Sequence, residues 1–435
     1  MCCKSKHLAK KQDLCYDDKD KIHWNRREKA LKTRVFLAFL LMMTLAASCA
    51  AQMNYDIVSP YLTYTKLDSE DAPPVLIDVL GGEALPEGME IIGGADGSTS
   101  IIVAQEDGPT SILLTENYAE AAEMEESWPK TFIITLAGDT TLGSTDDLRK
   151  RDDCFENVAA EKGYGWFFSG LSDLFGSDDM TLVNFEGTLT EETKKKDKKF
   201  NFKGPAEYTD ILTLGSVEAV TVANNHTLDY GETGREDTIA NLENAGITVS
   251  GNGQLGVFEK DGVKVGMTGY CFPYSNGKKD ITKDVKALRE MGCQIVIASF
   301  HWGSEYREDF TAEQRNIGRA AIKAGADFVV GHHPHIVQGI ESYQDTYIAY
   351  SVGNLVFGGN VDPDDRDAAA IRLTFTVDED KATDMDMTIV PLRLTELKDG
   401  TDYRPVVARG EEGERIVGRI LRRSSKMDGF ENGTY

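Results

Sequence analysis

Three histidines occur within four positions of the sequence, at His332, His333 and His335. They directly follow a β-branched apolar run that is typical of a buried strand. Each imidazole carries two polar nitrogens, and both need partners once the ring leaves water, so a hydrophobic core rarely holds such a cluster. Because imidazole is a common ligand of divalent metals, the cluster predicts a metal-binding site.

Other side chains that could bind a metal follow apolar runs in the same way. All five histidines beyond residue 34 lie at such positions. In an open α/β sheet the carboxyl ends of the strands meet at one crevice, so residues far apart in the sequence come together there. The sequence therefore predicts one shared site. Its further candidates are Asp139, Glu186, Asn225, His226, His301 and Asn354.

The candidate ligands are carboxylates, imidazoles and amides, without a thiolate. This set suits Mn²⁺, Zn²⁺ or Fe²⁺ and does not suit a cysteine-rich structural zinc site. Two such cations roughly 3.5 to 4 Å apart would clamp a phosphoryl group, and we expect Glu186 to bridge them. Taken singly, Asp139 could be a turn or cap residue, and His301 a core histidine with satisfied nitrogens. Asn225 and Asn354 could simply tie loops together.

Strands and helices must alternate along the chain to position these residues. From residue 130 onward, apolar β-rich runs alternate with stretches that carry apolar residues at helical spacing and end in glycine. This alternation predicts an α/β fold with a mainly parallel sheet and helical crossovers, followed by an antiparallel strand pair and a closing helix. The expected strands are 131–139, 180–187, 217–226, 263–271, 293–303, 326–335, 347–358, 369–378 and 384–394. The expected helices are 235–246, 282–292, 311–325 and 411–426.

Residues 1–48 have the layout of an export signal. Through Arg34 the chain has eleven Lys or Arg against five Asp or Glu, and thirteen uncharged apolar residues follow. That run is too short to cross a bilayer as a helix, which argues against a multi-pass transporter. It ends in small residues before Cys49, as in a bacterial lipobox. Lipidation of Cys49, cleavage near Ala50 and an uncleaved anchor remain open, and each would export the rest of the chain.

Residues 49–128 are strongly acidic, with sixteen Asp or Glu and a single basic residue, Lys66. We expect a tether or stalk here. Within it the pattern DGxTSI occurs twice at an interval of eleven residues, which predicts two short strands after Asp-Gly turns. Residues 129–435 are expected to form the main domain. The net charge of -25 argues against nucleic acid as a partner.

Seven motifs together resemble the bacterial capsule synthesis protein family, also called the CapA or poly-γ-glutamate capsule family. Its domain is similar to calcineurin-like metallophosphoesterases. The resemblance covers roughly residues 130–425 and implies a four-layer α/β/β/α sandwich with two central sheets and a metal centre at the strand ends. The motifs are GDTTLG, VNFEGTLT, FNFKGPAEY, VANNHTLDYG, FHWGSEY, GHHPHIVQG and SVGNLVFG, in the family's order and approximate spacing.

The resemblance also implies a role for each candidate ligand. Asp139 would bind the first metal, Glu186 would bridge two divalent metals, and Asn225 would bind the second. The ligand shells would be completed by His301, His333 and His335.

Catalytic roles follow from the same resemblance. His226 would be the proton donor that stabilises the transition state or leaving group, and Asp229 would orient it. Phosphoesterases normally begin this site with Asp-x-His, whereas Thr141 stands at the place of that histidine here. One imidazole ligand of the first metal is therefore missing, and His332 is the candidate to replace it.

Six lysines occupy the segment between Glu186 and Pro205. Such a run is usually a solvated loop. The functional alternative is that Lys203 and its neighbours draw an anionic polymer toward the metals. His332 and Asn354 are further candidates for substrate contact.

These features together predict an exported CapA-type protein, anchored by its N-terminus at the outer face of the cytoplasmic membrane. As an enzyme, it would use the metal site for hydrolysis or transfer on an anionic polymer such as poly-γ-glutamate or on a phosphate-bearing envelope substrate. As the alternative, it would hold or guide the polymer without turnover. Capsule synthetase or export proteins would be its partners in either case.

Overall fold

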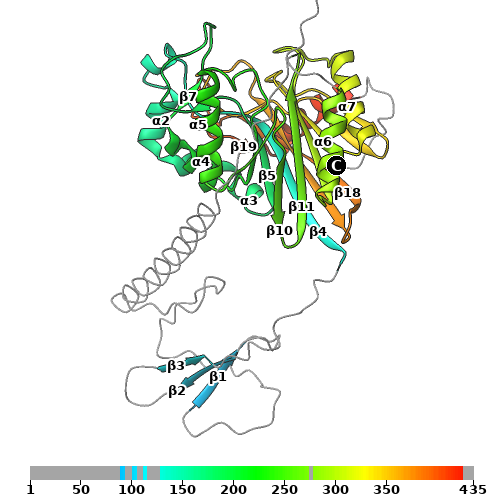
Figure 1. Cartoon of the computed structure of the whole chain (residues 1–435). Coiled ribbons are helices and arrows are strands. Elements are labelled where there is room, and N and C mark those ends of the chain that lie inside the picture. Colours follow the sequence, from blue (N-terminus) through cyan, green and yellow to red (C-terminus); the bar gives the residue numbers. More distant parts are fainter. Residues whose placement is uncertain (1–88, 94–99, 105–110, 115–127, 274–277, 425–435) are drawn as a thin grey trace, which may run out of the picture. The chain divides into compact units, whose positions relative to one another are not determined.

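The computed structural model describes residues 89–93, 100–104, 111–114, 128–273 and 278–424 (Figure 1). The chain divides into two compact units, Met1–Ala122 and Glu123–Tyr435. The predicted export signal, Cys49 and most of the acidic segment lie outside the described residues. Within the described residues, no helix is long and apolar enough to span a bilayer.

The first unit contains a small antiparallel sheet in the order β1-β2-β3. Its strands are β1 (Met89–Gly93), β2 (Ser100–Ala104) and β3 (Ser111–Leu114). The strands β2 and β3 are the two predicted from the DGxTSI repeat. The third strand, β1, pairs with β2 and was not predicted from the sequence.

The second unit is built on two large mixed sheets and a two-stranded pair. The eight-stranded sheet contains β19 (Val406–Val407), β18 (Ala382–Arg393), β17 (Asp367–Val377), β4 (Lys130–Thr141), β5 (Met180–Phe185), β8 (Ala219–Thr221) and β9 (Thr248–Ser250) in this order, and β16 (Asn354–Phe357) also pairs with β4. The six-stranded sheet contains β10 (Gly256–Lys260), β11 (Val263–Cys271), β12 (Ile295–His301), β13 (Phe328–His332), β15 (Thr346–Ala349) and β14 (Ile340–Tyr343). The separate pair is β6 (Thr188–Leu189) and β7 (Lys203–Gly204).

Helices cover both outer faces of these sheets, with α4 and α5 on one side and α6 and α7 on the other (Figure 1). The helix α7 begins with a capping box, in which Thr311 and Gln314 bond to each other's backbone N–H groups, and ends at Gly325 in the left-handed conformation. The helices are α2 (Phe155–Lys162), α3 (Ser172–Phe175), α4 (Thr209–Leu214), α5 (Gly231–Asn244), α6 (Lys278–Glu290), α7 (Ala312–Ala324) and α8 (Gly410–Ser424). Four short 3-10 helices are also described: η1 (Leu148–Lys150), η2 (Tyr164–Trp166), η3 (Ser169–Leu171) and η4 (Ala206–Tyr208).

The apolar side chains of each central strand point alternately into different cores. In β12, Ile295 and Ile297 pack between the two sheets, whereas Val296 and Phe300 pack under α6 and α7. Alternate residues of β5 are divided in the same way between the intersheet core and the core beneath α4 and α5. Three separate apolar cores therefore lie between four layers, which confirms the predicted α/β/β/α sandwich.

Most strand pairings in the two large sheets are parallel, as predicted: β4, β5, β8 and β9 run parallel to one another, and so do β11, β12, β13 and β15. Antiparallel strands extend three of the four sheet edges, and they include the predicted antiparallel pair, β17 and β18. One detail of the sequence prediction is wrong. The predicted strand 347–358 is in fact two strands, β15 and β16, which belong to different sheets. The backbone turns between them at Gly353, whose φ of +80° favours glycine, so the chain passes from one sheet to the other there.

Candidate metal centre

The candidate ligands are carried by both sheets. Asp139 lies near the carboxyl end of β4, and Glu186 directly follows β5. His301 ends β12, and His332 ends β13. The strands β4, β5 and β8 run parallel to one another, as do β11, β12 and β13, so each sheet delivers its polar residues at the carboxyl ends of its strands.

Glu186 lies at the centre of this cluster. Its side chain is fully buried, and neither carboxylate oxygen has a hydrogen-bond partner within the described residues. It belongs to two groups of close potential ligand atoms, one with Asp139 and His301 and one with His333 and His335. Within each group the atoms lie within 4.8 Å of one another. Burial raises the pKa of Glu186 to about 8, although the neighbouring His335 lowers it in part.

Asp139 is held by a dense set of donors. Its Oδ1 accepts from Asn184 Nδ2 at 2.9 Å and lies 3.3 Å from His332 Nδ1. Its Oδ2 lies 3.1 Å from His335 Nδ1 and accepts from the backbone N–H of His333 at 3.2 Å. Burial alone would raise the pKa of Asp139, but the close imidazoles of His332 and His335 outweigh it and hold that pKa well below its usual range.

Close approach of β4 and β16 fixes the position of Asp139. A Cβ on Gly138 would lie 2.2 Å from the carbonyl oxygen of Gly353, so only glycine fits between these strands. The approach makes Asp139 and Asn354 partners in the β4–β16 register. Asn354 in turn places its Oδ1 2.8 Å from His335 Nδ1. The predicted substrate contact Asn354 therefore orients a histidine of the cluster in this structure.

The histidine-rich turn has an unusual backbone. His333 and His335 have φ values of +91° and +58°, which non-glycine residues rarely adopt. Strain of this kind persists where the surroundings impose it, and it is concentrated at functional sites. Both nitrogens of His332 and the Nδ1 of His333 are buried without a hydrogen-bond partner among the described residues. These nitrogens are potential metal ligands, and His332 Nδ1 lies beside Asp139.

His301 and Asn225 connect the two sheets across the cluster. His301 Nε2 lies 3.0 Å from Asn225 Oδ1 and 3.7 Å from Glu186 Oε1. Burial and the neighbouring His333 lower the pKa of His301 well below its ordinary value, so the ring is neutral and able to donate a lone pair to a metal.

A second group of residues lies beside the metal ligands. His226 Nδ1 lies 2.8 Å from Asp229 Oδ2, and His226 Nε2 lies 3.7 Å from Glu186 Oε1. Asp229 is fully buried and also accepts from the backbone N–H of Phe202 at 2.7 Å. Burial lowers the pKa of His226 more than Asp229 raises it, so the imidazole is neutral near pH 7. Its Nε2 is directed at the cluster.

Of the lysine-rich loop, Lys198 is the residue that reaches this pair. Its Nζ forms an ion pair with Asp229 and donates to the backbone carbonyl of Asn225 at 3.0 Å. Lys203 was predicted to contact substrate. In the structure its Nζ donates to the backbone carbonyl of Glu192 at 2.9 Å. That nitrogen also lies 5.0 Å from the centre of the Tyr230 ring, so the structure does not bring Lys203 to the cluster.

Two asparagines at the site were missed in the sequence. Besides its bond to Asp139, Asn184 lies 3.4 Å from His301 Nδ1 and accepts from Asn224 Nδ2 at 3.1 Å. Asn224 Oδ1 also accepts from the backbone N–H of His226 at 3.1 Å. A polar residue inside the apolar run MTLVNF, and the first asparagine of NNH, were the available signals.

Thr141 stands where phosphoesterases have a histidine ligand, and its side chain has a structural contact here. Thr141 donates from its hydroxyl to the backbone carbonyl of Glu186 at 2.7 Å, so it fixes the loop that carries Glu186. His332, the candidate replacement, lies beside Asp139 as described above. The cluster thus provides carboxylate oxygens, imidazole nitrogens and an amide oxygen, and its buried atoms without partners fit divalent cations of the Mn²⁺, Zn²⁺ or Fe²⁺ type.

Comparison with known proteins identifies related sequences. The chain is 31% identical over 225 residues to the PGA biosynthesis protein CapA of Bacillus subtilis, covering 46% of this chain and 59% of that protein. It is 26% identical over 253 residues to the capsule biosynthesis protein CapA of Bacillus anthracis, covering 52% of this chain and 59% of that protein. The chain therefore spans about three fifths of the length of these relatives.

The solved structures that match this chain are more distant. A hypothetical protein from Thermus thermophilus and a novel phosphatase from Mycoplasma pneumoniae each give a TM-score of 0.38 at 14% identity. They cover 60% and 61% of this chain, and the matches include 99% and 95% of those proteins. At these TM-scores, the fold assignment rests on the sheets and cores of this chain alone.

The family model described as bacterial capsule synthesis protein PGA_cap matches residues 133–359, more than half of the chain. That span begins in β4 and ends after β16, so it includes every residue of the cluster. The chain belongs to the bacterial capsule synthesis protein PGA_cap family.

Proposed function

We propose that this chain acts at the bacterial cell envelope in the synthesis or export of poly-γ-glutamate or a related anionic capsule polymer. Its family membership and the functions named for the two Bacillus relatives support this role. The basic and apolar layout of residues 1–48, followed by Cys49, supports export and attachment to the outer face of the cytoplasmic membrane. Capsule synthetase and export proteins would be its partners there.

We further propose that the cluster is a divalent-metal site that catalyses hydrolysis or group transfer. The observation that carries this proposal is Glu186, a fully buried carboxylate with two oxygens lacking partners among the described residues and with ligand groups on both sides. An uncompensated buried carboxylate is costly, and a cation on each side would remove that cost. Glu186 is therefore the candidate to bridge two cations.

Each surrounding residue has a distinct task in this mechanism. Bound divalent cations would polarise a phosphoryl or carbonyl oxygen of the substrate. His226, held at Nδ1 by Asp229, would exchange a proton with the substrate through Nε2. Lys198 forms an ion pair with Asp229 and fixes the backbone at Asn225, so the histidine and its neighbouring ligand keep one geometry.

A non-catalytic role in holding the polymer is the second candidate, and Thr141 is the observation that favours it. Thr141 has no imidazole, and its hydroxyl donates to the Glu186 carbonyl. The ligand that phosphoesterases have at this position is therefore missing. The two candidates differ in their dependence on His226, because polymer binding would survive the loss of a proton donor.

The test combines elemental analysis of the purified chain with a screen for phosphodiester and γ-glutamyl hydrolysis. We expect bound divalent metal, and turnover that is lost both on chelation and in His226→Ala. Metal bound without turnover on any substrate would reject catalysis and favour the binding role. A chain that binds no metal at all would reject the metal site itself.

A further inference from the structure

A groove of about 710 Å³ lies away from the metal cluster, between the region of η3 and α3 and the start of α8. No residue of the cluster lines it. Four cations and three acidic side chains line the groove, so its net charge is slightly positive in a chain whose overall charge is -25. The charged lining residues are Arg393, Lys398, Arg404, Arg409, Asp173, Glu396 and Glu412.

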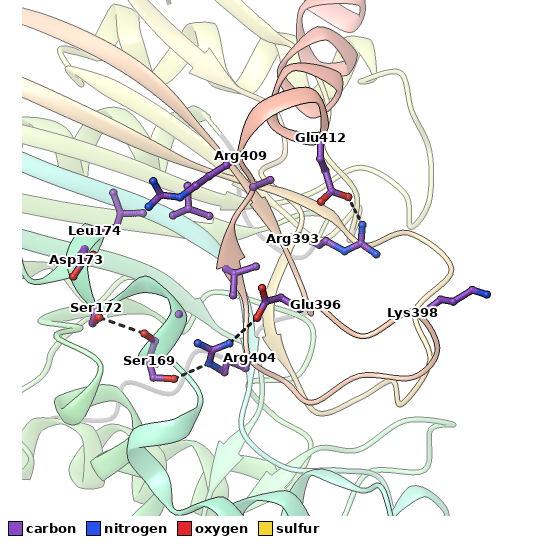
Figure 2. A pocket seen from close by; sticks show the side chains of 14 residues that line it. Ser169, Ser172, Asp173, Leu174, Arg393, Glu396, Lys398, Arg404, Arg409 and Glu412 are labelled. Atoms are coloured by element: carbon purple, nitrogen blue, oxygen red, sulfur yellow. Dashed lines mark hydrogen bonds and ion pairs between the residues drawn. The ribbon is translucent and has the colours of Figure 1, made fainter.

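Two of the four cations are already neutralised by neighbours. Arg404 lies 3.0 Å from Glu396 and donates to the hydroxyl of Ser169 at 2.9 Å. Arg393 forms an ion pair with Glu412. Figure 2 shows these pairs as dashed contacts along the groove. The positive charges of Arg393 and Arg404 are therefore largely neutralised, and a ligand would be attracted to them only weakly.

The other two cations, Arg409 and Lys398, are exposed. Neither side chain makes a hydrogen bond or ion pair with any residue in 128–273 or 278–424, and no dashed contact reaches them in Figure 2. Asp173 is the one acidic side chain of the lining that is likewise without an ion pair among those residues. The groove therefore offers two separated positive charges that are free to meet anionic groups on a ligand.

The strand β19 adds a second, independent feature. It is the end strand of the eight-stranded sheet and pairs only with β18 in the described sheet. Its residues Val406 and Val407 line the groove. Because β19 is two residues long and alternate residues of an edge strand direct their groups outward, its free side offers one residue's N–H and C=O, which can bond one amide unit of an extended chain.

We infer that this groove binds an anionic polyamide chain that lies along β19 with carboxylates on Arg409 and Lys398. The edge strand recognises amides, which a polyphosphate or teichoic-type polymer lacks, and the two cations recognise carboxylates. A γ-linked polyglutamate has both groups. The inference rests on the proposed role in capsule polymer metabolism and assigns a polymer-holding site separate from the metal centre.

Fluorescence anisotropy of a labelled γ-linked oligoglutamate tests the groove on the full chain. We expect Arg409→Glu/Lys398→Glu to weaken binding about tenfold or more at low salt, because two attractive charges become repulsive. Asp173→Asn removes a repulsive charge and should tighten binding about twofold to threefold. The matched control Lys286→Glu/Lys381→Glu changes two exposed lysines outside the groove and should leave binding within twofold of the wild type.

Three results would overturn the inference: no binding by the wild type, equal binding by the Arg409/Lys398 variant and the wild type, or equally tight binding of a polyphosphate of matched charge. Glu186→Gln separates this inference from the metal site, because the groove should still bind the oligomer in that variant. Loss of binding in Glu186→Gln but not in the groove variant would place the polymer at the metal cluster and reject the groove. Metal content of the same preparations reports on the metal centre independently.

Discussion

The Nδ1 atom of His226 lies 2.8 Å from Oδ2 of Asp229, and this contact turns the opposite nitrogen of the ring toward Glu186. An imidazole fixed in this way can exchange a proton only through Nε2. We expect His226→Ala to lower turnover of a generic phosphodiester by about 10²- to 10⁴-fold, the usual contribution of a general acid or base. Metal content should not change, because His226 is not among the grouped ligand atoms. Wild-type turnover in this variant would remove His226 from the mechanism.

Glu186→Gln tests the bridge. A carboxamide cannot bind two cations as a carboxylate does, so we expect bound metal measured by elemental analysis to fall at least about tenfold. Glu341→Gln is the matched control, because Glu341 is equally buried but bonds to Arg319 and Tyr350. The control should keep its metal and lose about 1 to 3 kcal/mol of unfolding free energy. Equal metal content in the two variants would contradict the bridging role.

Lys198 and Lys203 belong to the same lysine-rich segment and make a matched pair of substitutions. Lys198→Ala removes the ion pair with buried Asp229, so we expect turnover to fall about tenfold with metal retained. Lys203→Ala removes a bond to a backbone carbonyl and should leave the turnover number nearly unchanged. Steady-state kinetics of both variants on one substrate measures the difference. A larger defect in Lys203→Ala would restore Lys203 as the functional lysine of the loop.

Asn184→Ala tests the asparagines behind the ligands. The change removes a donor to Asp139 and leaves Asn224 Nδ2 without one of its acceptors. We expect about 1 to 3 kcal/mol lower unfolding free energy in denaturant titrations. Metal affinity should fall about 10- to 100-fold, as for other residues that orient ligands. Unchanged affinity, with only stability reduced, would assign Asn184 a purely structural role.

Asp178 gives a pH prediction outside the metal site. Burial raises its pKa to about 6, despite the hydrogen bond that Thr181 donates to it at 2.8 Å. The unfolded chain therefore loses this proton at lower pH than the folded chain, so the free energy of unfolding falls as pH rises from about 4 through 6. We expect Asp178→Asn to stabilise the protein by about 1 kcal/mol at pH 7.5, a value reduced for partial exposure, and to have little effect near pH 4. Urea titrations at the two pH values check this, and an equal effect at both would exclude titration of Asp178.

The sequence predicted much of the fold because apolar, β-rich runs alternate along the chain with stretches that carry apolar residues at helical spacing. The division of neighbouring residues between cores, as of Leu136 and Ala137 in β4, is seen only in the structure. The division of 347–358 into strands of two different sheets could not be predicted from the sequence. Both halves are apolar and contain β-branched residues, and only Gly353 marks the turn between them. Pairing between distant strands, as of β16 with β4, depends on tertiary packing.

At the site, the residues at the ends of strands were predictable from the sequence. Residues whose contacts depend on the path of a loop or on the direction of a side chain were not. Asp139, Glu186 and His301 come together because parallel strands of each sheet end on the same side. Lys198 reaches Asp229 because of the backbone path of its loop. The sequence has six lysines in this segment and no signal that distinguishes Lys198 from the others. Asn184 was hidden because an isolated polar residue in a strand is usually read as a packing detail.

The division of ligands between the two sheets has a consequence for the whole domain. Asp139 and Glu186 belong to one sheet, and His301 and the turn after β13 belong to the other, so a bound cation is a cross-link between the two halves of the sandwich. Such a link is absent from the unfolded chain, and metal at a hundred times its dissociation constant would add about 2.7 kcal/mol to the unfolding free energy. Cation supply would then help to set the stability of the folded domain, in addition to any chemistry at the site.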